Sequence, residues 1–241
     1  MTTQFFNPES FQSYLDSHKL RRIDGGSVEG GNEMYTYAFC DNESDRELRY
    51  CRSVVVNGNK SVVSVSFPFT YEINDTDFHH DRVRDVLSDE NWVFTDSREG
   101  TIVQLYFDKK SNEWNVSTMR KLNADRSRWG TVDSFGKQFV DAVTQNTNGS
   151  FTDFCATLDN NYTYTFLIPT TSSSRLVCIP LKGVNLYYTG RFNSGGVYDY
   201  KHTIPIIRSV CYSHMTVDEI RTYITDCDIN NYPVSYTHLT L

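Results

Sequence analysis

Several features that would define a function class are missing from this sequence of 241 residues. No run of roughly 18 apolar residues occurs, so no membrane-spanning helix is expected, and the opening MTTQFFNPESFQSYL lacks the basic flank and apolar core of a signal peptide. These absences predict a cytoplasmic protein without a membrane partner. Positive charge is also scarce, because 23 Lys and Arg face 30 Asp and Glu and leave a net charge of -7. Binding to nucleic acid through the overall charge of the protein is therefore not expected, and any such binding would need a local basic groove.

Motifs that bind metals, nucleotides or acyl groups are missing as well. The six cysteines are scattered without a C-x-x-C pair, which is typical of reduced, mostly buried thiols in a cytosolic chain. No P-loop, G-x-G-x-x-G, H-E-x-x-H or G-x-S-x-G sequence occurs. His79 and His80 are adjacent rather than at a ligand spacing, so we interpret them as part of a solvated acidic loop. No metal site built from protein side chains is predicted.

The composition that is present indicates one folded domain. A hydrophobic share of 39% is enough for a sizeable core, and an aromatic share of 14%, mostly Tyr and Phe, favours strands. We predict an α+β fold dominated by antiparallel strands, over residues 1–233. The last eight residues, VSYTHLTL at 234–241, look like a translated sequencing adapter. We expect them to be a non-native tail and the natural chain to continue beyond residue 233.

A hairpin within residues 93–130 organises the rest of the chain. Gly100 opens an alternating strand that runs to Phe107, and a charged turn, DKKSNE, follows. The second strand runs from Trp114 to Thr118 and leads into the basic pair Arg120–Lys121. Because the entry and the exit of a hairpin lie at the same end, charged residues gather at that end.

Local signals place the remaining elements. Spacing and capping predict helices over 8–22, 78–87 and 134–143 and from residue 216 onward. Alternation predicts strands over 34–40, 48–56, 61–69, 162–169, 175–180 and 184–189. Asn57–Gly58 predicts a two-residue hairpin turn between two of these strands.

Six segments then match, in order, the motifs of one superfamily. They are CRS from Cys51, SVSFPFTYEIND from Ser64, SREGT from Ser97, STMRK from Ser117, TFLIP from Thr165 with SRLV from Ser174, and LYYTGRFN from Leu186. On these segments the chain, from about residue 49 to 229, resembles the RNA ligase branch of the covalent nucleotidyltransferases, as found in phages and large DNA viruses. That superfamily includes the ATP-dependent ligases and the mRNA capping enzymes.

The resemblance implies a nucleotidyltransferase (ATP-grasp-like ligase) fold, with two antiparallel sheets, flanking helices and a nucleotide cleft between the sheets. It implies ATP and magnesium as cofactors, and a nucleotide or an RNA 5′-phosphate end as the partner. The family nucleophile lies in the sequence K-x-D-G. In this chain Ser97 occupies the lysine slot, Glu99 replaces the aspartate, and Gly100 is retained.

The departures from the family fall on its chemistry. Family members attach AMP to the lysine as a phosphoramidate before passing it to an RNA end. A serine would form a phosphodiester with a poor alkoxide leaving group, so onward transfer would be very slow. Leu167 stands where the family has a glutamate that contacts the ribose or a metal, and Phe69 stands in a basic slot. The remaining family motifs, E-G-x-V and a pair of lysines, would follow the helix expected from residue 216.

Four basic residues are candidates for phosphate contacts by this resemblance: Arg52, Arg120, Lys121 and Arg175. A structural ion pair explains Arg175 equally well. We predict that the loop at Ser97 lines a groove into which Arg52, Glu99 and the Arg120–Lys121 end point.

Three functions remain open from the sequence. The first is an RNA ligase-like pseudoenzyme that binds a nucleotide or an RNA end. The second is an active ATP-dependent RNA ligase with a relocated lysine, for which Lys121 is nearer than Lys109 or Lys110 on the hairpin turn. The third is a structural or interaction protein that retains only the fold.

Overall fold

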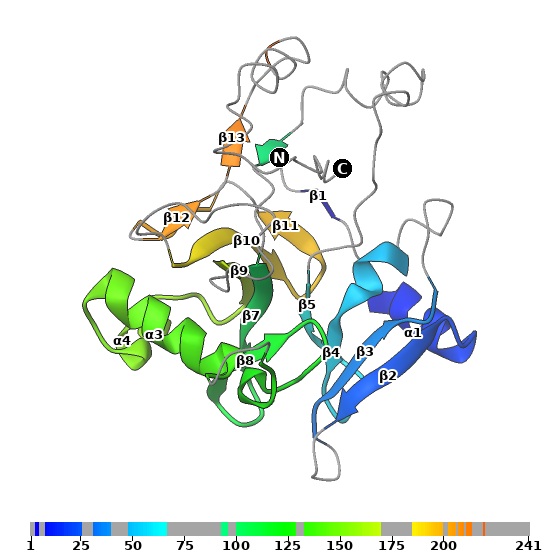
Figure 1. Ribbon diagram of the computed structural model, residues 1–241. Helices are drawn as coiled ribbons and strands as arrows, with labels where there is room; N and C mark the ends of the chain where they lie inside the picture. The colour runs from blue at the N-terminus through cyan, green and yellow to red at the C-terminus, as the bar shows by residue number, and fades with distance from the viewer. Residues whose placement is uncertain are drawn as a thin grey trace.

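The computed structural model describes residues 3–4, 8–25, 31–39, 48–66, 93–95, 100–128, 133–169, 185–199, 202–205, 207–209, 211–213 and 219. Within them the chain has an α+β fold with a seven-stranded sheet, a four-stranded sheet, a two-stranded ribbon and a few helices (Figure 1). The strands pair antiparallel, apart from one parallel pair between β10 and β12. The predicted α+β class with mainly antiparallel strands is therefore confirmed.

The seven-stranded sheet has the order β1-β11-β10-β9-β7-β8, with β12 beside β10. Its strands are β1 (Thr3–Gln4), β7 (Gly100–Asp108), β8 (Glu113–Thr118), β9 (Tyr162–Pro169), β10 (Tyr187–Asn193), β11 (Val197–Asp199) and β12 (Arg208–Ser209). The predicted central hairpin is confirmed as β7–β8, and β9 has the predicted bounds. The strand predicted over 184–189 begins later, at Tyr187, and continues to Asn193.

Two helices cover one face of this sheet and enclose the larger core. They are α3 (Phe135–Thr147) and α4 (Phe151–Ala156), seen to the left in Figure 1. Phe139 and Phe154 pack against Phe166 of β9 in this core. Ser134 caps α3 by accepting a hydrogen bond from the backbone of Lys137, as the sequence predicts. Helix α4 was not predicted from the sequence, although its Ser150–Asp153 pair is a capping box.

The four-stranded sheet has the order β2-β3-β4-β5 and is covered by α1 (Pro8–Asp16). Its strands are β2 (Leu20–Gly25), β3 (Glu33–Tyr37), β4 (Val54–Val56) and β5 (Val62–Val65). Phe11 of α1 is buried against Leu20, Tyr35 and Val54 of the sheet. This face of the sheet therefore forms a second core.

The helix predicted over 8–22 is wrong at its C-terminal end. The helix ends at Asp16, and His18 adopts a left-handed conformation with φ 58. Leu20 then pairs with Tyr37 of β3. The pairing partner of Leu20 lies about twenty residues later, so local spacing does not reveal it. Strand pairing with Tyr37 outweighs the helix propensity of this segment.

The segment Leu48–Arg52 (η1) is a 3-10 turn rather than the start of the predicted strand. Four successive side chains, from Leu48 to Cys51, are buried. A strand turns alternate side chains to opposite faces, whereas a helical turn can direct consecutive side chains into one core. The strand itself begins at Val54.

The hairpin predicted at Asn57–Gly58 is present, but its connection is longer than two residues. Asn57 Oδ1 accepts hydrogen bonds from the backbone of Asn59 and Ser61, both at 3.0 Å. Lys60 takes the left-handed conformation with φ 61. The turn therefore uses the asparagine as a side-chain acceptor for its backbone.

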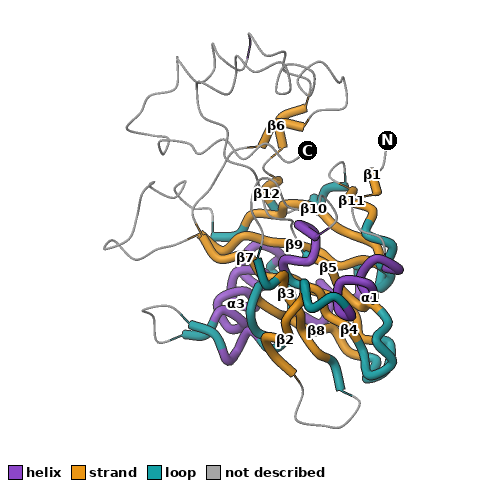
Figure 2. Tube along the Cα trace, turned by 90° about the vertical axis from the view of Figure 1, so that its right-hand side faces the viewer, coloured by secondary structure: helices purple, strands orange, loops and turns teal. Residues whose placement is uncertain are grey.

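The two-stranded ribbon pairs β6 (Val93–Thr95) with β13 (Cys211–Ser213), and Figure 2 shows β6 standing apart from the larger sheets. Several predicted features lie outside the described residues, namely the helix over 78–87, the strand over 175–180, the 79–80 histidine pair and the tail from 234. The helix predicted from 216 lies outside them apart from residue 219. In the described part of the chain no helix has the length and apolarity needed to cross a membrane. Cys51 and Cys155 are buried, and neither is part of a disulfide.

The two larger sheets meet through β5, which lies against β7, β9 and β10. We call the side of the seven-stranded sheet away from α3 and α4 the Gln104 face. The side of the four-stranded sheet away from α1 is the Met34 face. Met34 and Val55 are fully buried against Tyr106 of β7, so the Met34 face packs on the Gln104 face at this level.

Candidate functional site

Gly100 begins β7 at a point of close backbone approach to β9. It pairs with Pro169, and a Cβ built on Gly100 would lie 2.2 Å from the carbonyl oxygen of Ile168. A contact with backbone cannot be relieved by rotating a side chain, so this position requires glycine. The predicted loop at 97–99 therefore leads directly into a strand start that is fixed against β9.

An apolar row lies next to Gly100 on the Gln104 face. The register sets Ile102 of β7 beside Leu167 of β9, and Leu167 beside Tyr187 of β10. Leu167 and Tyr187 are buried and Ile102 packs against them. Leu167, which the predicted resemblance sets in the slot of a family glutamate, thus belongs to a continuous apolar strip and has no side-chain oxygen to offer a ligand.

A polar row follows, centred on Gln104. The register sets Ser117 of β8 on one side of Gln104 and Thr165 of β9 on the other. All three residues are fully buried. The hydroxyls of Ser117 and Thr165 have no hydrogen-bond partner in the described part of the chain. Buried hydroxyls without partners are rare in folded proteins and require an explanation.

Gln104 also joins the two sheets. Its Oε1 accepts a hydrogen bond from Ser64 Oγ of β5 at 3.1 Å, and its Nε2 lies 3.5 Å from the sulfur of Met119. Ser64, Ser117, Met119 and Thr165 all come from segments on which the predicted resemblance rests. The fold therefore gathers residues of three matched segments around one buried glutamine.

Arg52 ends η1 and leads into β4. Its carbonyl oxygen accepts a hydrogen bond from Thr36 Oγ1 at 2.7 Å, which ties it to β3. Its side chain is partly exposed, and no carboxylate of the described residues forms an ion pair with it. Its guanidinium is thus available to an anion from solvent.

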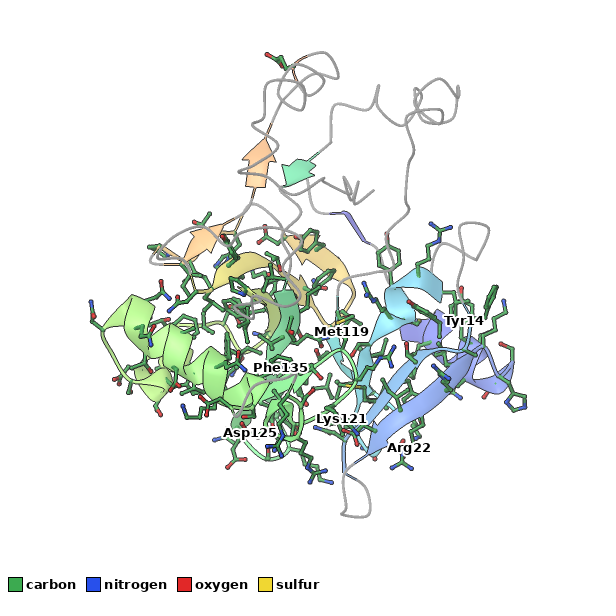
Figure 3. The ribbon with its side chains drawn as sticks, in the orientation of Figure 1. Tyr14, Arg22, Met119, Lys121, Asp125 and Phe135 are labelled. Carbon is green, nitrogen blue, oxygen red and sulfur yellow. The ribbon has the colours of Figure 1, made fainter. Side chains whose placement is uncertain are left out.

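Arg120 and Lys121 lie in a turn that leaves β8 toward the four-stranded sheet. Both backbone N–H groups donate to Thr118 Oγ1, and Leu122 N donates to Asp24 Oδ2 of β2 at 2.9 Å. Figure 3 shows Lys121 on the same side of the molecule as Arg22 of β2. The turn therefore runs from the Gln104–Met119 contact to the end of β2.

Ser97, Glu99 and Arg175 lie outside the described residues, so the predicted groove around Ser97 stays a prediction. Of the other predicted site residues, the structure ties Gly100 to β9, Arg52 to β3, and the turn holding Arg120 and Lys121 to β2. The polar row was missed from the sequence. Its signal was the recurrence of small polar residues on one face of β7, β8 and β9.

The lysines of the hairpin turn lie far from Gly100. Strand β7 is nine residues long, so Gly100 at its start and the turn after its last residue lie about 26 Å apart. Lys109 Nζ donates to Asn161 Oδ1 at 3.0 Å, and Lys110 is exposed. Neither lysine replaces a nucleophile at the Gly100 end.

Burial raises the pKa of Tyr106, which lies two residues along β7 from Gln104 on the same face. The pKa shifts of Glu33 and Cys155 concern groups on other elements. Lys60 hydrogen-bonds Glu33 and lowers the pKa of that carboxyl, while desolvation opposes the shift. Burial raises the pKa of the Cys155 thiol to about 12, so this thiol is no nucleophile. Within the described ranges no group of three metal-ligating side chains is found, so we assign no step to magnesium.

A separate cavity of about 380 Å³ lies between β8 and α3. It is lined by Trp114, Asn115, Val116, Leu122, Asn123, Asp125, Gly136, Lys137, Val140 and Phe151. None of the predicted site residues lines it, so it is distinct from the Gln104 row.

No protein-family model matches this chain. Two curated relatives are viral proteins, each described as an immediate-early protein ICP-46 homolog. The relative from invertebrate iridescent virus 3 is 32% identical over 155 residues, which is 61% of this chain and 34% of the relative. The relative from invertebrate iridescent virus 6 is 32% identical over 163 residues, which is 62% of this chain and 35% of the relative. The chain thus spans about a third of the length of these relatives.

Proposed function

We propose that this chain is an RNA ligase-like protein of nucleotidyltransferase fold that binds a nucleotide or an RNA 5′ end without forming a nucleotide–lysine bond. The observation that carries the proposal is the gathering of the matched segments around Gln104. Ser64, Ser117 and Thr165 surround it, and Gly100 opens the same strand. These segments are scattered over about a hundred residues of the sequence, and their meeting on one face supports a shared role in binding.

The apolar strip and Arg52 together suit a ligand that has an apolar part and a charged part. Ile102 is the partly exposed member of the apolar strip that it forms with the buried Leu167 and Tyr187, so a base would contact the strip at Ile102. Arg52 supplies a cation without an internal carboxylate, which fits a phosphate. Nucleotides combine both kinds of group. ATP therefore fits these residues through its base and its phosphates.

The absence of covalent transfer follows from the residue at 97. An adduct on Ser97 would be a phosphodiester, and its alkoxide would leave poorly. Lys109 and Lys110 lie at the wrong end of β7 to act instead. Lys121 remains the lysine that a relocated mechanism would require, because its ammonium forms no ion pair with a described carboxylate.

Incubation with α-labelled ATP and magnesium, together with an equilibrium binding titration, tests the proposal. We expect saturable binding of ATP or of a 5′-phosphorylated RNA, and no label that survives denaturation. An acid-labile covalent label that is lost in Lys121→Ala would instead establish an active ligase. Absence of binding to both ligands would leave a protein that retains only the fold and would end the proposal.

A further inference from the structure

Arg21 lies on the Met34 face of the four-stranded sheet. It pairs with Thr36 of β3. Its neighbour Leu20 is buried in the α1 core, so strand alternation turns Arg21 to the opposite side. Thr36 lies two residues beyond Met34, which is buried on that same side. Arg21 and Thr36 therefore extend the Met34 face toward the solvent-exposed end of the sheet.

Thr36 links Arg21 to Arg52. Its hydroxyl donates to the carbonyl oxygen of Arg52 at 2.7 Å, so the backbones of the two arginines lie on either side of one threonine. Two strand spacings correspond to about 10 Å. Arginine side chains are long enough to meet at a common anion across that distance.

Arg21 and Arg52 differ from Arg22 and Lys60, because neither of them forms an ion pair with a described carboxylate. Arg22 forms an ion pair with Glu33 at 3.3 Å, and Lys60 pairs with the same Glu33. Glu33 shares the face of Tyr35, whose hydroxyl donates to it, so this compensated group lies on the opposite side from Arg21.

A buried hydroxyl without a partner belongs to the same row. Extension of the β3–β4 register by one pair sets Ser53 opposite Thr36, and the carbonyl of Ser53 accepts from the backbone of Ser66 at 3.1 Å. Ser53 is fully buried, and its hydroxyl has no hydrogen-bond partner among the described residues. Ser53 directly follows Arg52, so this unused hydroxyl lies beside the backbone of Arg52 and in register with Thr36 and Arg21.

We infer that Arg21 and Arg52 together bind a phosphate group, with Thr36 holding the two arginines at a fixed separation. A guanidinium presents its donors in a rigid fork that matches phosphate oxygens, and an anion between the two removes their mutual repulsion. The inference rests on the proposed function and specifies the residues that would hold the phosphate of its ligand. The phosphate comes either from a nucleotide or from an RNA 5′ end.

Arg21→Gln and its neighbour Arg22→Gln form a matched pair for the test. Both remove one positive charge from β2, but only Arg21 lies on the proposed side. We would titrate each variant and the unmodified chain with ATP, with a short 5′-phosphorylated RNA and with the same RNA carrying a 5′-hydroxyl. Arg52→Gln is measured alongside, and thermal unfolding verifies that each variant is folded.

We expect Arg21→Gln to weaken binding about 10- to 100-fold, the value of one charge-assisted hydrogen bond, with Arg22→Gln unchanged. A loss in the ATP arm identifies the phosphate of a nucleotide, and a loss confined to the 5′-phosphorylated RNA identifies the RNA end. Equal effects of the two variants, or no effect of Arg21→Gln while Arg52→Gln weakens binding, would overturn the inference alone. Absence of binding by the unmodified chain in all three arms would overturn the proposed function together with it.

Discussion

The backbone at Gly100 lies so close to Ile168 that a Cβ on the glycine would come within 2.2 Å of the carbonyl oxygen of Ile168. The contact is made between the first residue of β7 and the end of β9. It explains physically why a glycine follows Ser97–Glu99, since any other residue would push the two strands apart at the point where the predicted loop ends.

We expect Gly100→Ala to lower the free energy of unfolding by about 1–3 kcal/mol, the usual cost of an added atom in a tightly packed region. Urea denaturation measures this change. Gly149→Ala is the matched control, because a Cβ there would meet its nearest atom at 3.7 Å, an ordinary contact distance. Similar losses in both variants would refute the close approach at Gly100.

The hydrogen bond between Ser64 and Gln104 joins the two sheets in a fully buried environment. Ser64→Ala leaves the glutamine oxygen without its donor, and we expect a loss of about 1–3 kcal/mol of stability. Gln104→Ala costs more, because it also removes buried volume. Urea denaturation of both single variants and of the double variant gives the coupling energy, and additive losses would show that the bond contributes nothing.

Introducing the residues of the predicted RNA ligase motif tests the role of position 97. We expect Ser97→Lys combined with Leu167→Glu to gain an acid-labile covalent label from α-labelled ATP, because a lysine amine forms a phosphoramidate. Ser97→Ala with Leu167→Glu is the control and should stay unlabelled. Leu167 lies in an apolar row, so both variants lose stability and are compared only where circular dichroism shows them folded. A folded but unlabelled lysine variant would separate position 97 from the nucleotide.

His202 makes the stability of the folded protein depend on pH. Its Nδ1 lies 2.9 Å from the hydroxyl of Tyr188, and the neutral ring accepts that hydrogen bond. Desolvation by burial, aided by the charge of Arg191, lowers the pKa of His202 below the usual 6.5. The unfolded state therefore binds more protons in this range, and stability is lost as the pH falls below about 6.5.

Thermal unfolding between pH 7.5 and 5.5 measures this effect. We expect the melting temperature to fall over that interval and the fall to be smaller in His202→Gln. His18→Gln replaces an exposed histidine and should keep the pH dependence of the unmodified chain. An unchanged slope in His202→Gln would assign the effect to another group.

Elements with local signals were predicted well. Alternating apolar residues over 162–169 marked β9 along its whole length, and Ser134 marked the start of α3. Elements that depend on distant partners were not. Leu20 follows a helical pattern in sequence but belongs to a strand because it pairs with Tyr37. The candidate site divides in the same way, since Gly100 was chosen from the sequence and its site role stays a prediction, whereas Arg21 was assigned to a helix and overlooked.

Read alone, the amino-acid order specifies the α+β class, the β7–β8 hairpin and the succession of segments that resemble an RNA ligase, because each depends on neighbours within a few residues. The burial of Gln104 between Ser64, Ser117 and Thr165 depends on folding. So does the alignment of Arg21 with Arg52 across Thr36. Both arise from strand register, which long-range pairing and the packing of two cores establish together.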